Sequence, residues 1–242
     1  MVNLRCFMSF RFKQFTVDDS RAAQKVGTDG VLIGAWADVT GVHSVLDVGA
    51  GCGLVSLMIA QRTAGTDCSI TAVELDDGAW ADCRENFGNS PWSTRLDVVK
   101  GDFASVEGTY DLIVSNPPFF LGDLASATAS RTLARQGGAL NYFTLIDFAS
   151  QHLTPDGRLA FTSDLRHEKE IMFRAELCRM ALRRLCRVSG KEGRAPIRLL
   201  WEFQLSSDTS VRTEYESFAH RDVDGNYHRD YIELTKDFYL KL

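Results

Sequence analysis

Short apolar runs alternate with longer amphipathic segments between residues 43 and 162, and this alternation restricts the fold more than any other feature of the chain. Regular strand–helix alternation is typical of a parallel sheet with helices on both of its faces. The expected strands of this region span 43–48, 69–74, 95–99, 110–114 and 158–162. The expected helices span 53–62, 76–87 and 141–153, and a Pro-Asp-Gly turn follows the last of them. The sequence therefore predicts an α/β protein whose ligands bind at the carboxyl ends of the strands.

Segments on either side of this region extend the prediction. A helix at 167–179 precedes two strands at 182–189 and 197–205, which predict a closing hairpin with one antiparallel strand. A further strand is expected at 210–218 and a final helix at 227–238. Ahead of the alternation, 10–17 predicts a short strand or hairpin arm. The glycine-containing loop 25–30 then leads into a helix reaching residue 36, which Thr28 or Asp29 is expected to cap.

The composition excludes several classes of protein. With 242 residues, 45% of them hydrophobic and 24% charged, the chain suits one α/β domain with or without a subdomain. Its six cysteines form no Cys-x-x-Cys pair and accompany no paired histidines, so we expect neither a metal site nor a disulfide framework. Reduced thiols fit these cysteines better, so we expect a cytoplasmic protein. No apolar run reaches transmembrane length, and the first twelve residues lack a signal-peptide core.

Charge is distributed unevenly along the chain. The net charge is −5, which by itself indicates no nucleic-acid partner. Ten basic and four acidic residues lie between Arg166 and Arg198, however, so this window carries a net charge of +6. The sequence leaves two interpretations open, which are a solvated helix face with an adjoining hairpin and a surface that binds a polyanion.

A glycine-rich loop follows the first strand of the alternation, with glycines at 49, 51 and 53. Glycines allow the backbone to approach a ligand closely, and the amino terminus of the next helix favours a carboxylate. Glu74, at the end of the second strand, is placed to accept both hydroxyls of a ribose. Leu54 stands where a dinucleotide-binding G-x-G-x-x-G motif requires Gly or Ala, so a nucleotide-dependent oxidoreductase is disfavoured.

The buried strand at 110–114 ends in Asn116-Pro117-Pro118-Phe119-Phe120. Pro117 moves Asn116 out of helical geometry, so the amide projects from the carboxyl end of the sheet. The side-chain carbonyl of Asn116 and the backbone carbonyl of Pro117 then form two acceptors for the hydrogens of a planar exocyclic amine. Phe119 can stack on the flat face of such a substrate. The alternative is a plain Pro-Pro turn with both phenylalanines in the core.

These two motifs resemble those of S-adenosylmethionine-dependent amino-methyltransferases. The segment 47–53 is similar to their first motif, Asp/Glu-x-Gly-x-Gly-x-Gly, and 116–119 is similar to their [Asn/Asp/Ser]-Pro-Pro-[Tyr/Phe] motif. The resemblance implies a Rossmann-like class I methyltransferase fold with seven strands, one of them antiparallel, and S-adenosylmethionine as cofactor. The cofactor-binding residues that it implies are Lys25, Gly27, Thr28, Asp29, Asp47, Gly49, Gly51, Gly53, Glu74, Leu75, Asp102, Phe103 and Asn116.

Further segments narrow the resemblance to one bacterial family. The segments 12–15, 25–37, 47–51 and 89–92 and the ending 237–240 are similar to the tRNA(Val) adenine-N6 methyltransferases, which modify adenine 37 beside the anticodon. The resemblance implies an amino-terminal extension, 1–40, that packs over the cofactor site, and a methyltransferase domain, 41–242. It also implies a monomer that binds tRNA, acts in the cytoplasm and uses no metal.

The same resemblance assigns roles to the candidate residues. Asn116, Pro117 and Phe119 are expected to be catalytic, and S-adenosylhomocysteine is expected as the product. Phe119 stands where many relatives have Tyr, which retains stacking and loses a hydroxyl. The segment 121–138 is interpreted as a substrate lid. The expected substrate-binding residues are Phe119, Phe120, Arg131, Arg135, Arg183 and Arg187.

Other functions remain open from the sequence. An Asn-Pro-Pro-Phe motif suits a glutamine amide equally well, so an N5-glutamine methyltransferase acting on a release factor is the first alternative. That family usually carries a helical amino-terminal domain, whereas about forty residues precede the first strand here. Adenine-N6 or guanine-N2 methylation of rRNA or DNA, and a catalytically idle RNA-binding module, are the others.

Overall fold

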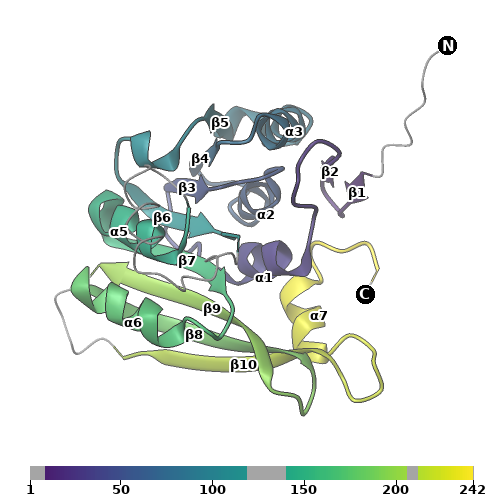
Figure 1. The fold of residues 1–242 in the computed structure, drawn as a ribbon. Helices are drawn as coiled ribbons and strands as arrows, with labels where there is room; N and C mark the ends of the chain where they lie inside the picture. Colours follow the sequence, from purple (N-terminus) through teal and green to yellow (C-terminus); the bar gives the residue numbers. More distant parts are fainter. Residues whose placement is uncertain (1–8, 119–139, 206–211, 242) are drawn as a thin grey trace.

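The computed structural model describes residues 9–118, 140–205 and 212–241. Its centre is a sheet with the strand order β10-β8-β9-β7-β6-β3-β4-β5 (Figure 1). All neighbouring pairs are parallel except the two that involve β9, which is therefore the one antiparallel strand. The strands are β3 (Ser44–Val48), β4 (Ser69–Glu74), β5 (Leu96–Lys100), β6 (Tyr110–Ser115), β7 (Leu153–Ser163), β8 (Met180–Lys191), β9 (Pro196–Leu205) and β10 (Glu214–Arg221).

Helices cover both faces of this sheet (Figure 1). Successive strand residues alternate between the faces, as the pleat requires. Leu112 and Val114 of β6 belong to the core cluster under α1, α2 and α3, whereas Ile113 belongs to the cluster under α5 and α6. The helices are α1 (Thr28–Trp36), α2 (Leu54–Arg62), α3 (Asp77–Gly88), α5 (Tyr142–His152), α6 (Glu168–Leu177) and α7 (Arg229–Thr235), with short 3-10 turns at Ser93–Arg95 and Phe103–Ser105.

The two ends of the described chain lie together. The short strands β1 (Phe10–Arg11) and β2 (Thr16–Val17) form an antiparallel hairpin, as the sequence predicted. Phe12, between them, is buried against Phe15 and forms an isolated bridge with Tyr239. The carboxyl-terminal segment therefore holds the amino-terminal hairpin in place.

Most predicted elements are confirmed, with two corrections and one addition. The backbone of Gly27 caps α1, and no side chain does so, which makes the predicted cap by Thr28 or Asp29 wrong. Strand β7 begins at Leu153, and the predicted Pro-Asp-Gly turn forms an irregularity within it, between the pairs Tyr110↔Leu153 and Leu112↔Arg158. The further strand joins the sheet as β10, so the sheet has eight strands and not seven. Residues 210–211 of that prediction lie outside the described residues.

The helices in the described ranges are all too short or too polar to cross a bilayer. The same part of the chain contains no group of three or more His, Cys, Asp or Glu side chains arranged to hold a metal ion.

Candidate active site at the carboxyl edge of the sheet

Strands β3, β4 and β6 are neighbours and run parallel, so their carboxyl ends meet at one edge of the sheet. The glycine-rich loop leaves β3 there and is fastened to β4 by a hydrogen bond from the Gly49 N–H to the Val73 carbonyl, 2.9 Å long. Gly53, at φ +83°, ends the loop, and a Cβ there would lie 2.6 Å from the Phe87 ring. Only glycine therefore suits the start of α2.

Glu74 closes the loop from the opposite side. Its Oε2 accepts a hydrogen bond from the Gly51 N–H and its Oε1 accepts one from the Asp76 N–H, each 2.8 Å long. A carboxylate oxygen accepts more than one hydrogen bond, so both oxygens keep capacity for a ligand. The space beside Gly51 is open, because a Cβ there would meet nothing within 4 Å. The two residues form a cradle open to a diol.

Two adjacent cavities occupy this edge. The wider has a volume of about 430 Å³ and the narrower about 50 Å³. Gln24, Gly49, Gly51 and Asn116 line both, which shows that the cavities meet beside the Asn-Pro-Pro turn. Other predicted residues on the wider cavity are Glu74, Leu75, Asp102 and Phe103, and those on the narrower one are Lys25, Gly27 and Asp47.

Asp47 is a buried carboxylate on the narrower cavity, with 1% of its surface exposed. Its Oδ2 accepts hydrogen bonds from the backbone N–H and the hydroxyl of Ser56, at 3.1 and 2.7 Å. Burial raises the pKa of Asp47 to about 7, and the negative charge of Glu74 adds to the rise while the Ser56 bonds oppose it. A cation in the narrow cavity would favour the ionised form of this side chain.

The segment between β2 and α1 forms one wall of both cavities, and α3 holds it there. The backbone N–H groups of Arg21 and Ala22 donate to buried Asp82, at 2.8 and 2.9 Å. Asn86, one turn further along α3, exchanges hydrogen bonds with Asp18 and also donates to the Cys52 carbonyl of the glycine-rich loop. Helix α3 therefore fixes two cavity walls at once.

Asn116 lies directly after β6, where the two cavities meet. The preceding residue anchors the turn, because the Ser115 hydroxyl donates to the Val48 carbonyl at 2.7 Å. The Asn116 Oδ1 accepts a hydrogen bond from the Thr162 hydroxyl at 2.6 Å. Pro117 is buried, and Pro118 lines the wider cavity. The predicted substrate residues Phe119, Phe120, Arg131 and Arg135 and the predicted lid 121–138 lie outside the described residues.

The structure places some predicted cofactor residues away from the cavities. Thr28 and Asp29 begin α1 but line neither cavity, and the Asp29 carboxylate pairs with Arg198 at 3.0 Å. Gly53 packs against α3 as described above. Gln24 and Thr162 were not among the predicted site residues. Gln24 directly precedes the predicted loop 25–30, and this position could have marked it as a site residue. Thr162 is the last residue of a predicted apolar strand, and nothing in the sequence marked it.

The two predicted RNA-binding arginines of β8, Arg183 and Arg187, differ in their partners and in their distance from the catalytic edge. Arg187 forms a bidentate pair with Glu168 of α6. Arg183 lies four residues nearer the amino end of β8, away from the catalytic edge, on a polar recess that it shares with Arg158 and Glu214. Beyond Arg187, β8 ends at that edge in a hairpin turn with exposed Lys191 and Arg194.

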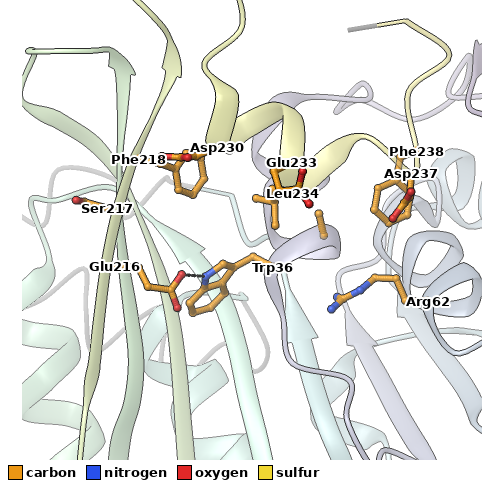
Figure 2. Close-up of a pocket in the computed structure, with 11 residues that line it drawn as sticks. Trp36, Arg62, Glu216, Ser217, Phe218, Asp230, Glu233, Leu234, Asp237 and Phe238 are labelled. Atoms are coloured by element: carbon orange, nitrogen blue, oxygen red, sulfur yellow. Dashed lines mark hydrogen bonds between the residues drawn. The ribbon is translucent and has the colours of Figure 1, made fainter.

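A larger pocket, about 710 Å³, lies between α1, β10 and α7. Figure 2 shows Glu216 of β10 pointing at the Trp36 ring of α1, with a hydrogen bond of 2.9 Å from Nε1. The carboxylates of Asp230, Glu233 and Asp237 also line this pocket. No residue of the glycine-rich loop or the Asn-Pro-Pro turn lines this pocket, so the cavities at the carboxyl ends of β3, β4 and β6 are the better candidate for the active site.

Comparisons with known proteins agree with this assignment. The family model described as "Methyltransferase small domain" matches residues 31–177. The tRNA1(Val) (adenine(37)-N6)-methyltransferase of Tolumonas auensis is 40% identical over 235 residues, which are 97% of this chain and 98% of that protein. The enzyme of the same name from Aeromonas hydrophila is 41% identical over 239 residues, 96% of this chain and 98% of that protein.

Solved structures support the fold. A predicted O-methyltransferase from Agrobacterium tumefaciens superposes with a TM-score of 0.65 over 86% of this chain and 96% of its own, at 17% sequence identity. Identity this low bears on the fold alone, which is that of a class I methyltransferase. Because relatives about 40% identical match nearly the whole chain, the chain belongs to the tRNA1(Val) (adenine(37)-N6)-methyltransferase family.

Proposed function

We propose that this protein transfers a methyl group from S-adenosylmethionine to N6 of an adenine in tRNA, most specifically adenine 37 of tRNA(Val). The observation that carries the proposal is that Glu74, the glycine-rich loop and Asn116 line two adjacent cavities at one sheet edge. The printed names of relatives about 40% identical over nearly the whole chain support the substrate.

The residues present fit this cofactor. The carboxylate of Glu74 suits the ribose hydroxyls, and Leu75, Asp102 and Phe103 surround the space for the adenine in the wider cavity. Asp47 suits the amino group of the methionine part, since a buried carboxylate favours a cation beside it. When bound, S-adenosylmethionine supplies an already activated methyl group, so the protein supplies mainly position and electrostatics.

Asn116 and Pro117 would act on the substrate amine. The nitrogen lone pair of an exocyclic amine is delocalised into the ring, and two carbonyl acceptors hold its hydrogens where the lone pair faces the methyl donor. Such acceptors gain strength as the nitrogen develops positive charge, which is transition-state stabilisation. Phe119 would stack on the flipped adenine, as base-modifying enzymes do. The proposal assigns no residue as a strong base.

The RNA would approach over β7, β9 and β8, because the cofactor would occupy the β3–β4–β5 half of the same edge. Lys191 and Arg194, at the β8–β9 turn, are exposed there, and within the described residues no carboxylate pairs with either. We therefore place the main positive footprint at this turn. Arg131 and Arg135 stay part of the prediction, and Arg187 contributes less because Glu168 neutralises it.

The division of the chain belongs to the same proposal. Residues 1–40 would act as an extension that covers the cofactor and 41–242 as the methyltransferase domain. Support comes from Gln24 and Lys25, which line the cavities from a segment anchored on α3. A cytoplasmic monomer that needs no metal completes the proposal, and light scattering would test the oligomeric state.

One experiment tests the function. The protein is incubated with radiolabelled S-adenosylmethionine and, separately, with unmodified tRNA, rRNA, DNA and a release factor. We expect label in tRNA, released by digestion as N6-methyladenosine and identified by mass spectrometry, and lost when position 37 of tRNA(Val) is changed to guanosine. Label in guanine or in glutamine would overturn the substrate assignment.

A further inference from the structure

The hydrogen bond between Thr162 and Asn116 joins two neighbouring strands at their carboxyl ends. Ser115 of β6 is in register with Phe161 of β7, so the next residue on each strand, Asn116 and Thr162, are also neighbours. Thr162 is buried, with 0% of its surface exposed, and its hydroxyl lies 2.6 Å from the Asn116 Oδ1. This is a short hydrogen bond from a buried hydroxyl to a half-buried amide that lines the cavities.

The Thr162 hydroxyl favours one orientation of the Asn116 amide, with Oδ1 toward Thr162 and Nδ2 toward α1. An asparagine side chain carries an acceptor and a donor of nearly the same shape, so sterics alone do not fix its orientation. The Thr162 hydroxyl is a donor to Oδ1, and the amide nitrogen faces Gly30 of α1, where a Cβ would lie 3.7 Å from Nδ2. If the amide were reversed, Nδ2 would donate to the Thr162 hydroxyl, whose own proton would then have no acceptor among the hydrogen bonds of the described residues. An unpaired donor is costly for a buried group.

The carbonyl oxygen retains capacity for the substrate. An amide oxygen has two lone pairs, and the Thr162 hydroxyl uses one of them. The second remains for an N–H of the substrate amine. A reversed amide would present Nδ2 hydrogens to that amine, donor against donor, and would not support methyl transfer.

We propose that Thr162 is a positioning residue, whose hydroxyl holds the Asn116 amide with its oxygen available to the substrate amine. The proposal rests on the proposed amino-methyltransferase function. Thr162 itself touches neither substrate nor cofactor in this scheme, since it lines neither cavity. Its loss should therefore lower turnover and leave binding largely intact.

Two substitutions at this position separate the hydroxyl from the bulk of the side chain. Thr162→Val keeps the shape and removes the donor, whereas Thr162→Ser keeps the donor. At saturating cofactor we expect Thr162→Val to lower kcat about tenfold, with the KM for tRNA and the cofactor Kd within about twofold. Thr162→Ser should restore kcat to within about threefold of the wild type.

A matched control removes the same hydroxyl elsewhere. Thr235 is equally buried, and its hydroxyl donates to the Tyr231 carbonyl within α7. Thr235→Val should lower the melting temperature by an amount similar to Thr162→Val and leave kcat unchanged. A folded Thr162→Val enzyme with wild-type kcat would overturn the proposal, and so would failure of Thr162→Ser to recover activity.

A second measurement does not depend on the substrate. The side-chain NH₂ signals of Asn116, assigned by their loss in Asn116→Ala, should form one sharp pair in the wild type and become doubled or broadened in Thr162→Val. If the wild type modifies glutamine or guanine, the proposed function fails, and the same variants are then assayed on that substrate. An unchanged single pair of NH₂ signals in Thr162→Val would overturn the positioning role whatever the substrate.

Discussion

The catalytic-edge cavities and the pocket between α1, β10 and α7 differ in what their polar groups have left to offer. In the larger pocket the charge of Glu216 is paired with Arg184, that of Glu233 with Lys236, and Arg62 donates to the Gly34 and Ala37 carbonyls. At the sheet edge, Glu74 and Asn116 have partners and still keep acceptor capacity toward the cavity. Acceptors gathered at the ends of neighbouring parallel strands, and not cavity volume, therefore indicate where chemistry takes place.

The largest effect is expected at Asn116. Asn116→Ala removes an acceptor that strengthens as the amine becomes positive, so kcat should fall about a hundredfold. Binding of tRNA and cofactor should change much less. The measurement is methyl transfer to unmodified tRNA at saturating cofactor, with circular dichroism as the folding control. Near-normal N6-methyladenosine formation by the folded variant would refute the catalytic role.

Glu74 gives the next largest effect. Hydrogen bonds to an ionised acceptor contribute about 1.5–3 kcal/mol, so Glu74→Ala should weaken cofactor binding about ten- to a hundredfold. Isothermal titration calorimetry with S-adenosylhomocysteine measures this directly. Glu233→Ala, a carboxylate of the larger pocket, is the matched control and should bind as the wild type does. Equal affinities of the two variants would remove the distinction between the cavities.

Asp47 makes cofactor binding depend on pH. Because its pKa is raised to about 7, the carboxyl is largely protonated at pH 6, and the cationic cofactor binds best once the proton has left. Affinity should rise about fivefold between pH 6 and 7 and about tenfold between pH 6 and 8, and then level off. The stability of the protein without cofactor depends on pH in the opposite direction. The folded form holds a proton that the unfolded chain releases near pH 4, so stability falls as pH rises from about 4 to 7. Asp47→Asn should abolish both slopes.

A smaller effect is expected for the positive footprint. Charge reversal of Lys191 and Arg194 together should raise the KM for tRNA about fivefold and flatten its dependence on salt. Arg183→Glu, on the recess away from the catalytic edge, is the control and should change KM little. Arg187 is unsuitable for this test, because its replacement would also leave the negative charge of Glu168 without its partner. If the KM of the double variant keeps the wild-type dependence on salt, the β8–β9 turn is a solvated surface that does not bind RNA.

The sequence predicted what local patterns determine and missed what depends on neighbours across the sheet. Apolar periodicity located the strands, and chain order placed Glu74 and Asn116 at strand ends that parallel pairing brings together. The partner of Asn116 was not predictable, because it depends on the register between β6 and β7. The role of Asp29 was missed for a similar reason, since its partner Arg198 is 169 residues away. Arg187 looked free in sequence, but α6 brings Glu168 beside it.

The smallest effect is expected in the larger pocket. Glu216 accepts from the Trp36 Nε1 and pairs with Arg184, so Glu216→Gln keeps one acceptor and weakens an ion pair whose glutamate is 38% exposed. Partly exposed ion pairs contribute little to stability, about 0–1 kcal/mol, so the melting temperature should fall by no more than a few degrees. Methyl transfer and cofactor affinity should stay at wild-type values, since no residue of this pocket lines the edge cavities. A loss of tRNA methylation in a variant with wild-type stability would show that this pocket takes part in the reaction, and the contrast between the two regions would then fail.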